Sequence, residues 1–242
     1  MIERFHIWKR KNYRDRFLND ERQEVNSDES NGKRLVSEKL DAGYPEYVMG
    51  RRYQQTGRFN IEKGKIIFDG KSWNRKSLSK IGALIENPPI YENLSARENL
   101  KVRQQLLGTE ENRIDEVLQV VSLTETGKKK AGQFSLEMKQ RLGIAMALLG
   151  NPELLILDEP TNGLDPIGIE ELRELIRSFP KQGITVILSS HILSEVQLIA
   201  DKIGIISNGI LGYEGELEQG QNLEELFMDV VKENKKAGGI LF

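Results

Sequence analysis

Hydrophobic and polar residues are arranged without order in the first 57 positions and with clear periods after them. In residues 1–57 charged residues recur at neither a strand nor a helix period, and 26–32 is a polar, turn-rich run. Low hydrophobic content without a period favours disorder or irregular structure. The sequence therefore predicts no regular element in this segment.

From residue 58 the pattern predicts strands that alternate with helices. Aliphatic runs predict strands at 66–68, 80–85, 154–157, 184–188 and 203–206, and a turn-rich hairpin at 209–215. Apolar residues at helical spacing predict helices at 95–107, 114–121, 135–149, 166–176, around 196–199 and at 223–231. This alternation predicts an α/β fold, a mostly parallel sheet flanked by helices.

Local signals set several helix ends. Ser95 and Glu98 form a capping box, and Gly108 ends the helix that they begin. Ser135 is a second N-cap candidate. Asp165 is a third, because Pro166 follows it at the first helical position.

Two adjacent carboxylates follow the strand at 154–157. Four aliphatic residues in a row predict a strand buried on both faces, and Asp158 and Glu159 then lie at its carboxyl end. Ligands bind at that edge of open α/β sheets. The pattern favours a metal–phosphate site in which Asp158 holds Mg²⁺ and Glu159 orients or deprotonates a water. The alternative interpretation is a solvated strand end.

Composition excludes several classes of protein. Net charge is −2, so no basic field points to nucleic acid, although the Arg-rich run at 9–16 is either a nucleic-acid arm or a solvated segment. The chain has no cysteine and thus neither disulfides nor thiolate metal sites. No apolar run approaches the roughly 20 residues of a membrane-spanning helix.

Four segments then stand in a fixed order: Phe134–Arg141, Leu157–Pro160, Gly163–Asp165 and Ser190–His191. Their order and spacing strongly resemble the ATP-binding subunits of ABC transporters, over about residues 57–236. The resemblance implies a P-loop NTPase-like α/β domain at 58–236 with a helical subdomain at about 90–150, and a tail at 237–242.

The resemblance also implies roles for single residues. Asp158 looks like the Walker B ligand of Mg²⁺, and Glu159 like the general base. His191 looks like the switch histidine that contacts the γ-phosphate, or else it is a surface histidine that caps a helix. Asp165 would act across a dimer as well as capping its own helix. Ser135 begins the signature helix, whose amino-terminal amides suit a γ-phosphate bound by the opposite subunit.

Glu86 stands where most such subunits have glutamine. With 88–89 and 91–94 behind it, this position resembles the lantibiotic-immunity and bacitracin-resistance transporters, which handle peptide antibiotics. The resemblance implies that Glu86 couples the nucleotide site to the membrane subunit. The alternative is an exposed carboxylate at a strand end.

The chain departs from this family at three points. The phosphate loop G-x-x-x-x-G-K-[ST] is missing: 49–57 occupies its place and supplies neither the glycines nor the lysine. The strand that enters that loop is missing too, so we expect the sheet to lack a central member. Glu137 replaces the usual glycine of the signature, and a carboxylate about 4 Å from a phosphate repels it by roughly 1 to 4 kcal/mol.

Two explanations remain open for residues 1–57: a shifted reading frame, or a divergent amino-terminal segment with another role. Taken as it stands, the chain is expected to bind ATP poorly by itself, because the main phosphate anchors are absent.

The resemblance predicts an ATP-binding and ATP-hydrolysing subunit, with ATP and Mg²⁺ as cofactors, of a transporter that exports or gives immunity to a peptide antibiotic. The expected partners are transmembrane permease subunits and a second ATP-binding subunit, with the peptide contacted indirectly and no nucleic acid. The expected location is the cytoplasm, on the inner face of the cell membrane. One alternative is a catalytically inactive, truncated or frame-shifted subunit. Another is an ATPase acting on ribosomes or DNA, against which the lack of tandem units argues.

Overall fold

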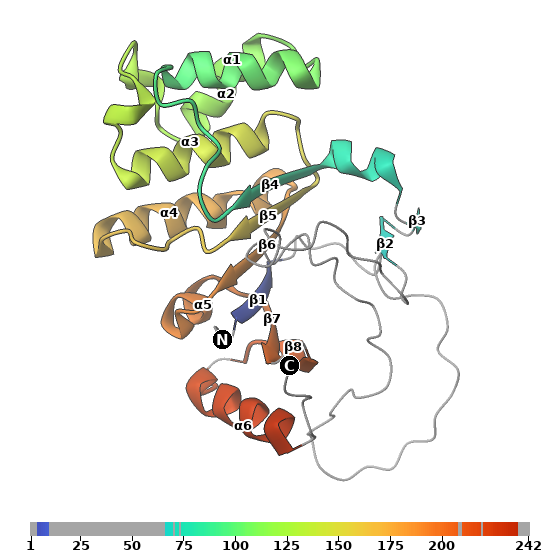
Figure 1. Cartoon of the computed structure of the whole chain (residues 1–242). Helices are drawn as coiled ribbons and strands as arrows, with labels where there is room; N and C mark the ends of the chain where they lie inside the picture. Colours follow the sequence, from blue (N-terminus) through green and yellow to red (C-terminus); the bar gives the residue numbers. More distant parts are fainter. Residues whose placement is uncertain are drawn as a thin grey trace, which may run out of the picture.

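A six-stranded sheet organises the described part of the chain (Figure 1). The computed structural model describes residues 4–9, 66–69, 71–72, 74–207, 210–218 and 220–236. The strands lie in the order β4-β5-β6-β1-β7-β8, and a separate two-stranded ribbon pairs β2 (Ile67–Phe68) with β3 (Lys71–Ser72). The predicted α/β class is confirmed.

Strand direction divides the sheet into two halves. β4 (Ile81–Ile85), β5 (Leu154–Asp158) and β6 (Thr185–Ser190) pair in parallel. β1 (Arg4–Lys9), β7 (Lys202–Ser207) and β8 (Ile210–Glu216) continue the sheet with antiparallel pairings. Since β1 runs against both neighbours, β7 points the same way as β4, β5 and β6, and the sheet is mostly parallel as predicted.

The strand β1 corrects two expectations. The sequence pattern predicted no regular element in residues 1–57, yet Arg4–Lys9 forms a strand. The sheet was also expected to lack a central member, yet β1 lies between β6 and β7 and pairs with both. Arg4–Lys9 has neither the aliphatic run nor the strict alternation by which the other strands were predicted, and its pairing depends on distant strands. The rest of the predicted disorder, at 1–3 and 10–57, lies outside the described residues.

The three helices with predicted N-caps begin where those caps predicted, whereas the last helix extends five residues past its predicted end at 231. The helices are α1 (Ala96–Leu107), α2 (Asn112–Val120), α3 (Leu136–Leu148), α4 (Pro166–Ser178), α5 (Leu193–Ile199) and α6 (Leu223–Lys236). Ser95 forms the predicted capping box with Glu98, and Gly108 adopts the left-handed conformation that ends α1. Ser135 and Asp165 accept hydrogen bonds from the first turns of α3 and α4.

The helices form two groups around the sheet. α1, α2 and α3 gather beyond the β4 edge, and α4 and α5 lie along one side of the sheet (Figure 1). Side chains that are at most 2% exposed fill the space between sheet and helices, among them Leu84, Leu155, Leu157, Leu172, Ile176, Val186 and Ile203. Residues 154 and 156 of β5 are half-buried, so the prediction of a strand buried on both faces holds fully for only one face. This core fixes the carboxyl ends of β4, β5 and β6 beside one another.

Candidate functional site

The carboxyl end of β5 carries two buried carboxylates. Asp158 is 2% exposed and Glu159 is 5% exposed. Glu159 adopts a φ of 49°, in the left-handed region, which costs a residue with a Cβ about 1 kcal/mol or more. This backbone turn ends the strand, and the two adjacent side chains have different partners: Asp158 contacts Ser189, and Glu159 contacts His191. Such strained positions gather at functional sites.

A serine of the neighbouring strand holds both acidic residues. The parallel register places Asp158 of β5 opposite Ser189 of β6. The Ser189 hydroxyl donates a hydrogen bond to Asp158 Oδ1, and the same hydroxyl oxygen accepts one from the Glu159 amide at 3.2 Å. The amide also lies 3.1 Å from the Ser189 carbonyl. The register of two strands therefore fixes the position of the acidic pair.

A histidine contacts the second carboxylate. His191 Nδ1 lies 2.8 Å from Glu159 Oε2, and the His191 side chain is 46% exposed whereas that of Glu159 is 6% exposed. The buried acid thus has a partner that reaches solvent. The structure brings Asp158, Glu159 and His191 together, and their predicted roles toward Mg²⁺, water and phosphate stay predictions.

The other predicted site residues lie at helix starts. Asp165 Oδ1 accepts a 2.7 Å hydrogen bond from the Gly168 amide, and Ser135 Oγ accepts one of 3.2 Å from the Met138 amide. Both side chains therefore fill the N-cap roles predicted for them. Their predicted roles toward a nucleotide concern a second subunit and stay predictions.

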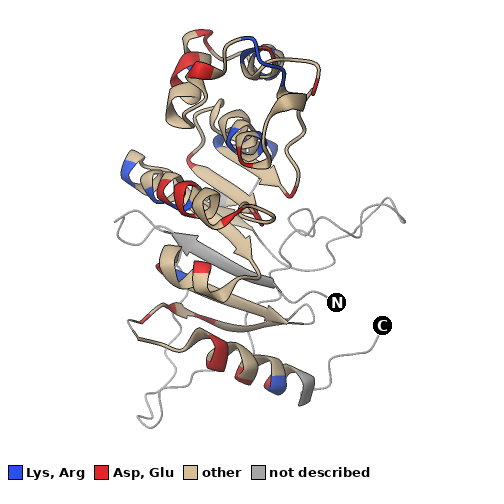
Figure 2. Ribbon diagram, turned by 90° about the vertical axis from the view of Figure 1, so that its left-hand side faces the viewer, with Lys and Arg blue, Asp and Glu red and all other residues tan. Residues whose placement is uncertain are grey.

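Glu137 lies in the first turn of α3 and is turned back along its own helix. Its Oε1 accepts a 2.6 Å hydrogen bond from Arg141 Nε. Arg141 also donates to Glu171 Oε2 of α4 at 2.8 Å. In Figure 2 the ribbon of α4 carries acidic and basic positions intermixed. The charge that was expected to repel a phosphate is thus paired with a guanidinium.

Glu86 ends β4 with the same backbone conformation as Glu159. Its φ is 48°, and the register of β4 with β5 places 85 opposite Asp158. The buried Gln140 of α3 donates from Nε2 to the Glu86 carbonyl at 3.3 Å. The residue that was predicted to couple the site to a partner therefore also touches the signature helix.

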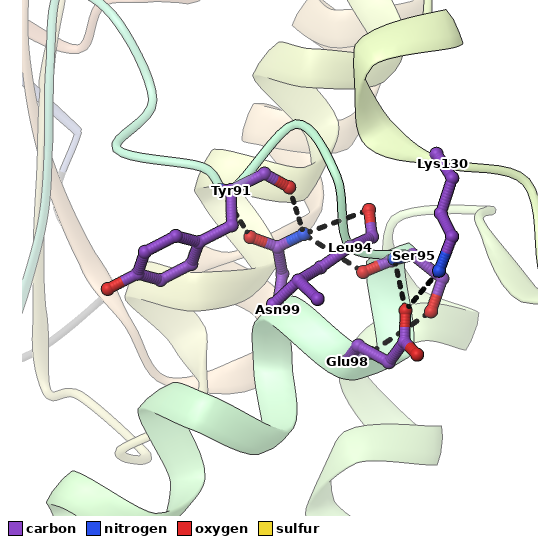
Figure 3. A network of polar contacts seen from close by, with 6 residues as sticks. All are labelled: Tyr91, Leu94, Ser95, Glu98, Asn99 and Lys130. Atoms are coloured by element: carbon purple, nitrogen blue, oxygen red, sulfur yellow. Dashed lines mark hydrogen bonds and ion pairs between the residues drawn. The ribbon is translucent and has the colours of Figure 1, made fainter.

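The loop that leaves Glu86 is fastened to α1 by one asparagine (Figure 3). Asn99 is fully buried, and its Oδ1 accepts from the Tyr91 amide at 2.7 Å while its Nδ2 donates to the Tyr91 carbonyl at 3.0 Å and the Ser95 carbonyl at 2.9 Å. Beside it, the Ser95 amide and then Lys130 lower the pKa of Glu98 to about 2. This loop therefore has a fixed shape.

Sequence reasoning gave no role to Ser189, Gln140 or Arg141. For Ser189 a signal existed, because a polar residue at the end of the next parallel strand must lie beside Asp158. Gln140 and Arg141 lie in the predicted helix at 135–149, but their side chains bind residues far away in the sequence. Only the packing of α3 reveals their partners.

The acidic pair fits the metal end of a nucleotide site. Mg²⁺ is held in proteins by one or two carboxylates together with phosphate oxygens and water. Asp158 and Glu159 can provide the carboxylates. Among the described residues no cluster of three or more metal-ligating side chains exists that would form an all-protein site. The one Gly-Lys-Ser triplet, at 70–72, does not open a helix, since Lys71–Ser72 is the short strand β3.

No helix in the described part of the chain combines the length and apolarity that crossing a membrane requires.

Known proteins resemble the chain over most of its length. A sequence profile described as "ABC transporter" matches residues 54–162. The lantibiotic transport ATP-binding protein SrtF of Streptococcus pyogenes is 52% identical over 181 residues, which cover 75% of this chain and 79% of SrtF. The bacitracin transport ATP-binding protein BcrA of Bacillus licheniformis is 50% identical over 74% of this chain and 57% of BcrA.

Solved structures share the fold. A structure described as the ATP-binding subunit of an ABC transporter superposes with a TM-score of 0.60 and 28% identity, over 70% of this chain and 77% of that chain. CbiO1 of Clostridium perfringens, described as part of the ABC transporter complex cbiONQ, superposes with a TM-score of 0.59 and 27% identity, over 73% of this chain and 72% of that chain.

Proposed function

Because the chain belongs to the ATP-binding proteins of ABC transporters, in the group that handles lantibiotics and bacitracin, we propose that it hydrolyses ATP to drive export of, or immunity to, a peptide antibiotic. The family resemblance drawn from four motifs is confirmed. One observation supports hydrolysis above all: the acidic pair at the end of β5 is held by Ser189 and His191 in a buried setting.

The residues divide the work as follows. Asp158 would hold Mg²⁺, and the ion would supply neutralisation of charge on the phosphate oxygens. Glu159 Oε accepts the proton of the attacking water, since a buried carboxylate with one fixed partner is a suitable base. His191 orients Glu159 through the 2.8 Å contact and, from its exposed position, reaches a γ-phosphate.

The proposed assembly contains two ATP-binding subunits on the cytoplasmic, inner face of the cell membrane, bound to transmembrane permease subunits. Ser135 at the start of α3 faces the nucleotide of the opposite subunit, where free amides and the helix dipole favour an anion. Asp165 acts across the same dimer, and Glu86 links the nucleotide site to the permease. The ATPase domain spans 58–236, with α1 to α3 in its helical subdomain.

The main phosphate anchors of this family are missing from the sequence. The full sequence contains no G-x-x-x-x-G-K-[ST], and such a loop supplies most of the phosphate anchors in this family. We therefore expect the purified chain to bind ATP more weakly than micromolar, as measured by equilibrium dialysis with labelled ATP. Micromolar affinity would show that another segment replaces the loop.

A susceptibility assay tests the function. Cells that express the chain together with its permease should grow at higher concentrations of the peptide antibiotic than cells with the permease alone. Glu159→Gln should abolish this protection, whereas Glu174→Gln, an exposed change on α4, should not. Equal protection by wild type and Glu159→Gln would favour an inactive subunit. Co-purification with ribosomes or DNA in place of a membrane protein would contradict the transport proposal.

A further inference from the structure

The carboxylate of Glu137 packs against a different helix from the one that carries it. A Cβ built on Gly168, in the first turn of α4, would lie 3.5 Å from Glu137 Cγ and 3.6 Å from its Oε2. The same Cβ would lie 3.3 Å from Asp165 Oδ1, which caps that turn. Glu137 thus lies within van der Waals range of the first turn of α4, at the positive end of the α4 dipole.

A neighbouring apolar contact joins the same two segments. A Cβ on Gly163 would lie 3.0 Å from Leu136 Cδ2. Gly163 has a φ of 76°, so a residue with a Cβ would be strained there even without this contact. The first turn of α3 therefore packs through two successive side chains on residues 163–168, the loop that runs into the first turn of α4, called here the 163–168 loop.

Arg141 forms ion pairs with Glu137 and with Glu171 of α4, and so links the two helices. Its side chain is 11% exposed and divides its donors among Glu137 of α3, Glu171 of α4 and the Val121 carbonyl at the end of α2. The two carboxylates are 30% and 56% exposed, so the guanidinium is the buried member of the group. Charge-assisted hydrogen bonds of this kind are among the strong ones in proteins.

The 163–168 loop in turn leads to the acidic pair. The Asn162 amide donates to the Glu159 carbonyl at 3.1 Å, and the Leu164 amide donates to the Thr161 carbonyl at 3.2 Å. A displacement of the first turn of α3 would thus reach Glu159 through a short, hydrogen-bonded segment of the same chain.

We propose that Glu137 is a positioning residue which ties the first turn of α3 to the 163–168 loop, so that these two segments move as one body. The functional meaning rests on the proposed function, in which α3 faces the nucleotide of the opposite subunit while Glu159 acts on the chain's own. Glu137 then transmits the occupancy of one site to the base of the other, in place of repelling a phosphate.

Hydrogen exchange of the full-length chain without nucleotide tests the tie. The informative amides are those of Gly168 and Ile169, which donate to Asp165 at 2.7 and 2.9 Å. Glu137→Ala should speed their exchange by roughly three- to tenfold, because the loop opens more often. Glu137→Gln, which keeps an acceptor oxygen for Arg141, should restore part of the protection. Glu174→Gln on the same helix, whose partner is Arg177, should leave it unchanged.

The readout separates a local tie from a general loss of stability. Faster exchange confined to 162–169, with unchanged exchange in β7 and β8, supports the proposal. Wild-type exchange at Gly168 and Ile169 in Glu137→Ala would overturn it, and so would faster exchange throughout the sheet. A failure of the proposed function would appear instead as absent antibiotic protection, which this nucleotide-free measurement does not involve.

Discussion

Acidic side chains have different partners at the carboxyl edge of the sheet and in the first turns of the helices. At the sheet edge, Asp158 and Glu159 are buried and contact a serine hydroxyl and an imidazole. In the helical region, Glu137 and Glu98 contact Arg141 and Lys130. A carboxylate that contacts a hydroxyl or an imidazole can still bind a metal ion or accept a proton. A carboxylate in an ion pair with Arg or Lys is less available for either role, and it stabilises the fold instead.

Backbone conformation shows the same division. Glu86 and Glu159 end neighbouring parallel strands with φ near 48°, a conformation that residues other than glycine rarely adopt. The N-caps Ser95, Ser135 and Asp165 have ordinary extended dihedral angles. Of the five residues other than glycine with a positive φ in the described part of the chain, two, Glu86 and Glu159, lie at the proposed site, and none is one of these three N-caps.

The largest effect is expected from Asp158→Asn. Loss of the carboxylate that holds Mg²⁺ should lower ATP turnover by at least about 100-fold, while the free energy of unfolding changes by less than about 1 kcal/mol. Steady-state ATPase assays at millimolar Mg²⁺, together with urea unfolding, measure both. Asp229→Asn on α6 is the control. A large loss of stability in Asp158→Asn would erase the distinction between the two regions.

Arg141→Met should show the opposite profile. Removing the buried guanidinium leaves Glu137 and Glu171 without their cation, which should cost about 2 to 3 kcal/mol of unfolding free energy, discounted because both acids reach solvent. Urea denaturation measures it. Lys101→Met, which breaks the exposed pair with Glu111, should cost less than about 0.5 kcal/mol. Equal costs would mean that the Arg141 group has no special structural role.

Asn99→Ala is expected to cost less. The buried side-chain amide of Asn99 hydrogen-bonds to the 91–95 loop through both its oxygen and its nitrogen. Its loss leaves the Tyr91 backbone amide without this acceptor, which should lower the free energy of unfolding by about 1 to 2 kcal/mol. Thermal and urea unfolding detect this, and Asn93→Ala, on the exposed part of the same loop, is the control. If the two variants unfold alike, the network in Figure 3 does not hold the loop.

Glu98→Gln should give the smallest effect, visible only through pH. The pKa of Glu98 is lowered from 4.5 to about 2 by the Ser95 amide and then by Lys130. A depressed pKa stabilises the fold above the unfolded value, and this contribution is lost as pH falls from about 4.5 toward 2. The urea midpoint of wild type should exceed that of Glu98→Gln at pH 6 and approach it at pH 3. A constant difference would exclude this linkage.

The sequence predicted most of the fold because its signals are local. Capping residues and aliphatic runs gave the ends of α1, α3 and α4 and the position of β5 to within a residue or two. The acidic pair and His191 were predicted from the order of the motifs, and their proximity follows from parallel strands that end at one edge.

What the sequence did not reveal depends on contacts between distant segments. β1 owes its place to pairing with β6 and β7, and nothing in 4–9 indicates those partners. The expected repulsion by Glu137 took no account of Arg141, whose three acceptors come from different parts of the chain. Gln140 likewise bridges 54 positions to reach Glu86.

The most direct measurement is ATP turnover of the transporter that contains this chain, at saturating millimolar ATP, for wild type and Glu159→Gln. If Glu159 is the base, the wild-type complex hydrolyses ATP and the variant is slower by about 100-fold or more, since a general base contributes roughly 10²- to 10⁴-fold. Turnover that is absent in both, or equal in both, would contradict a catalytic role for the carboxyl edge of β5.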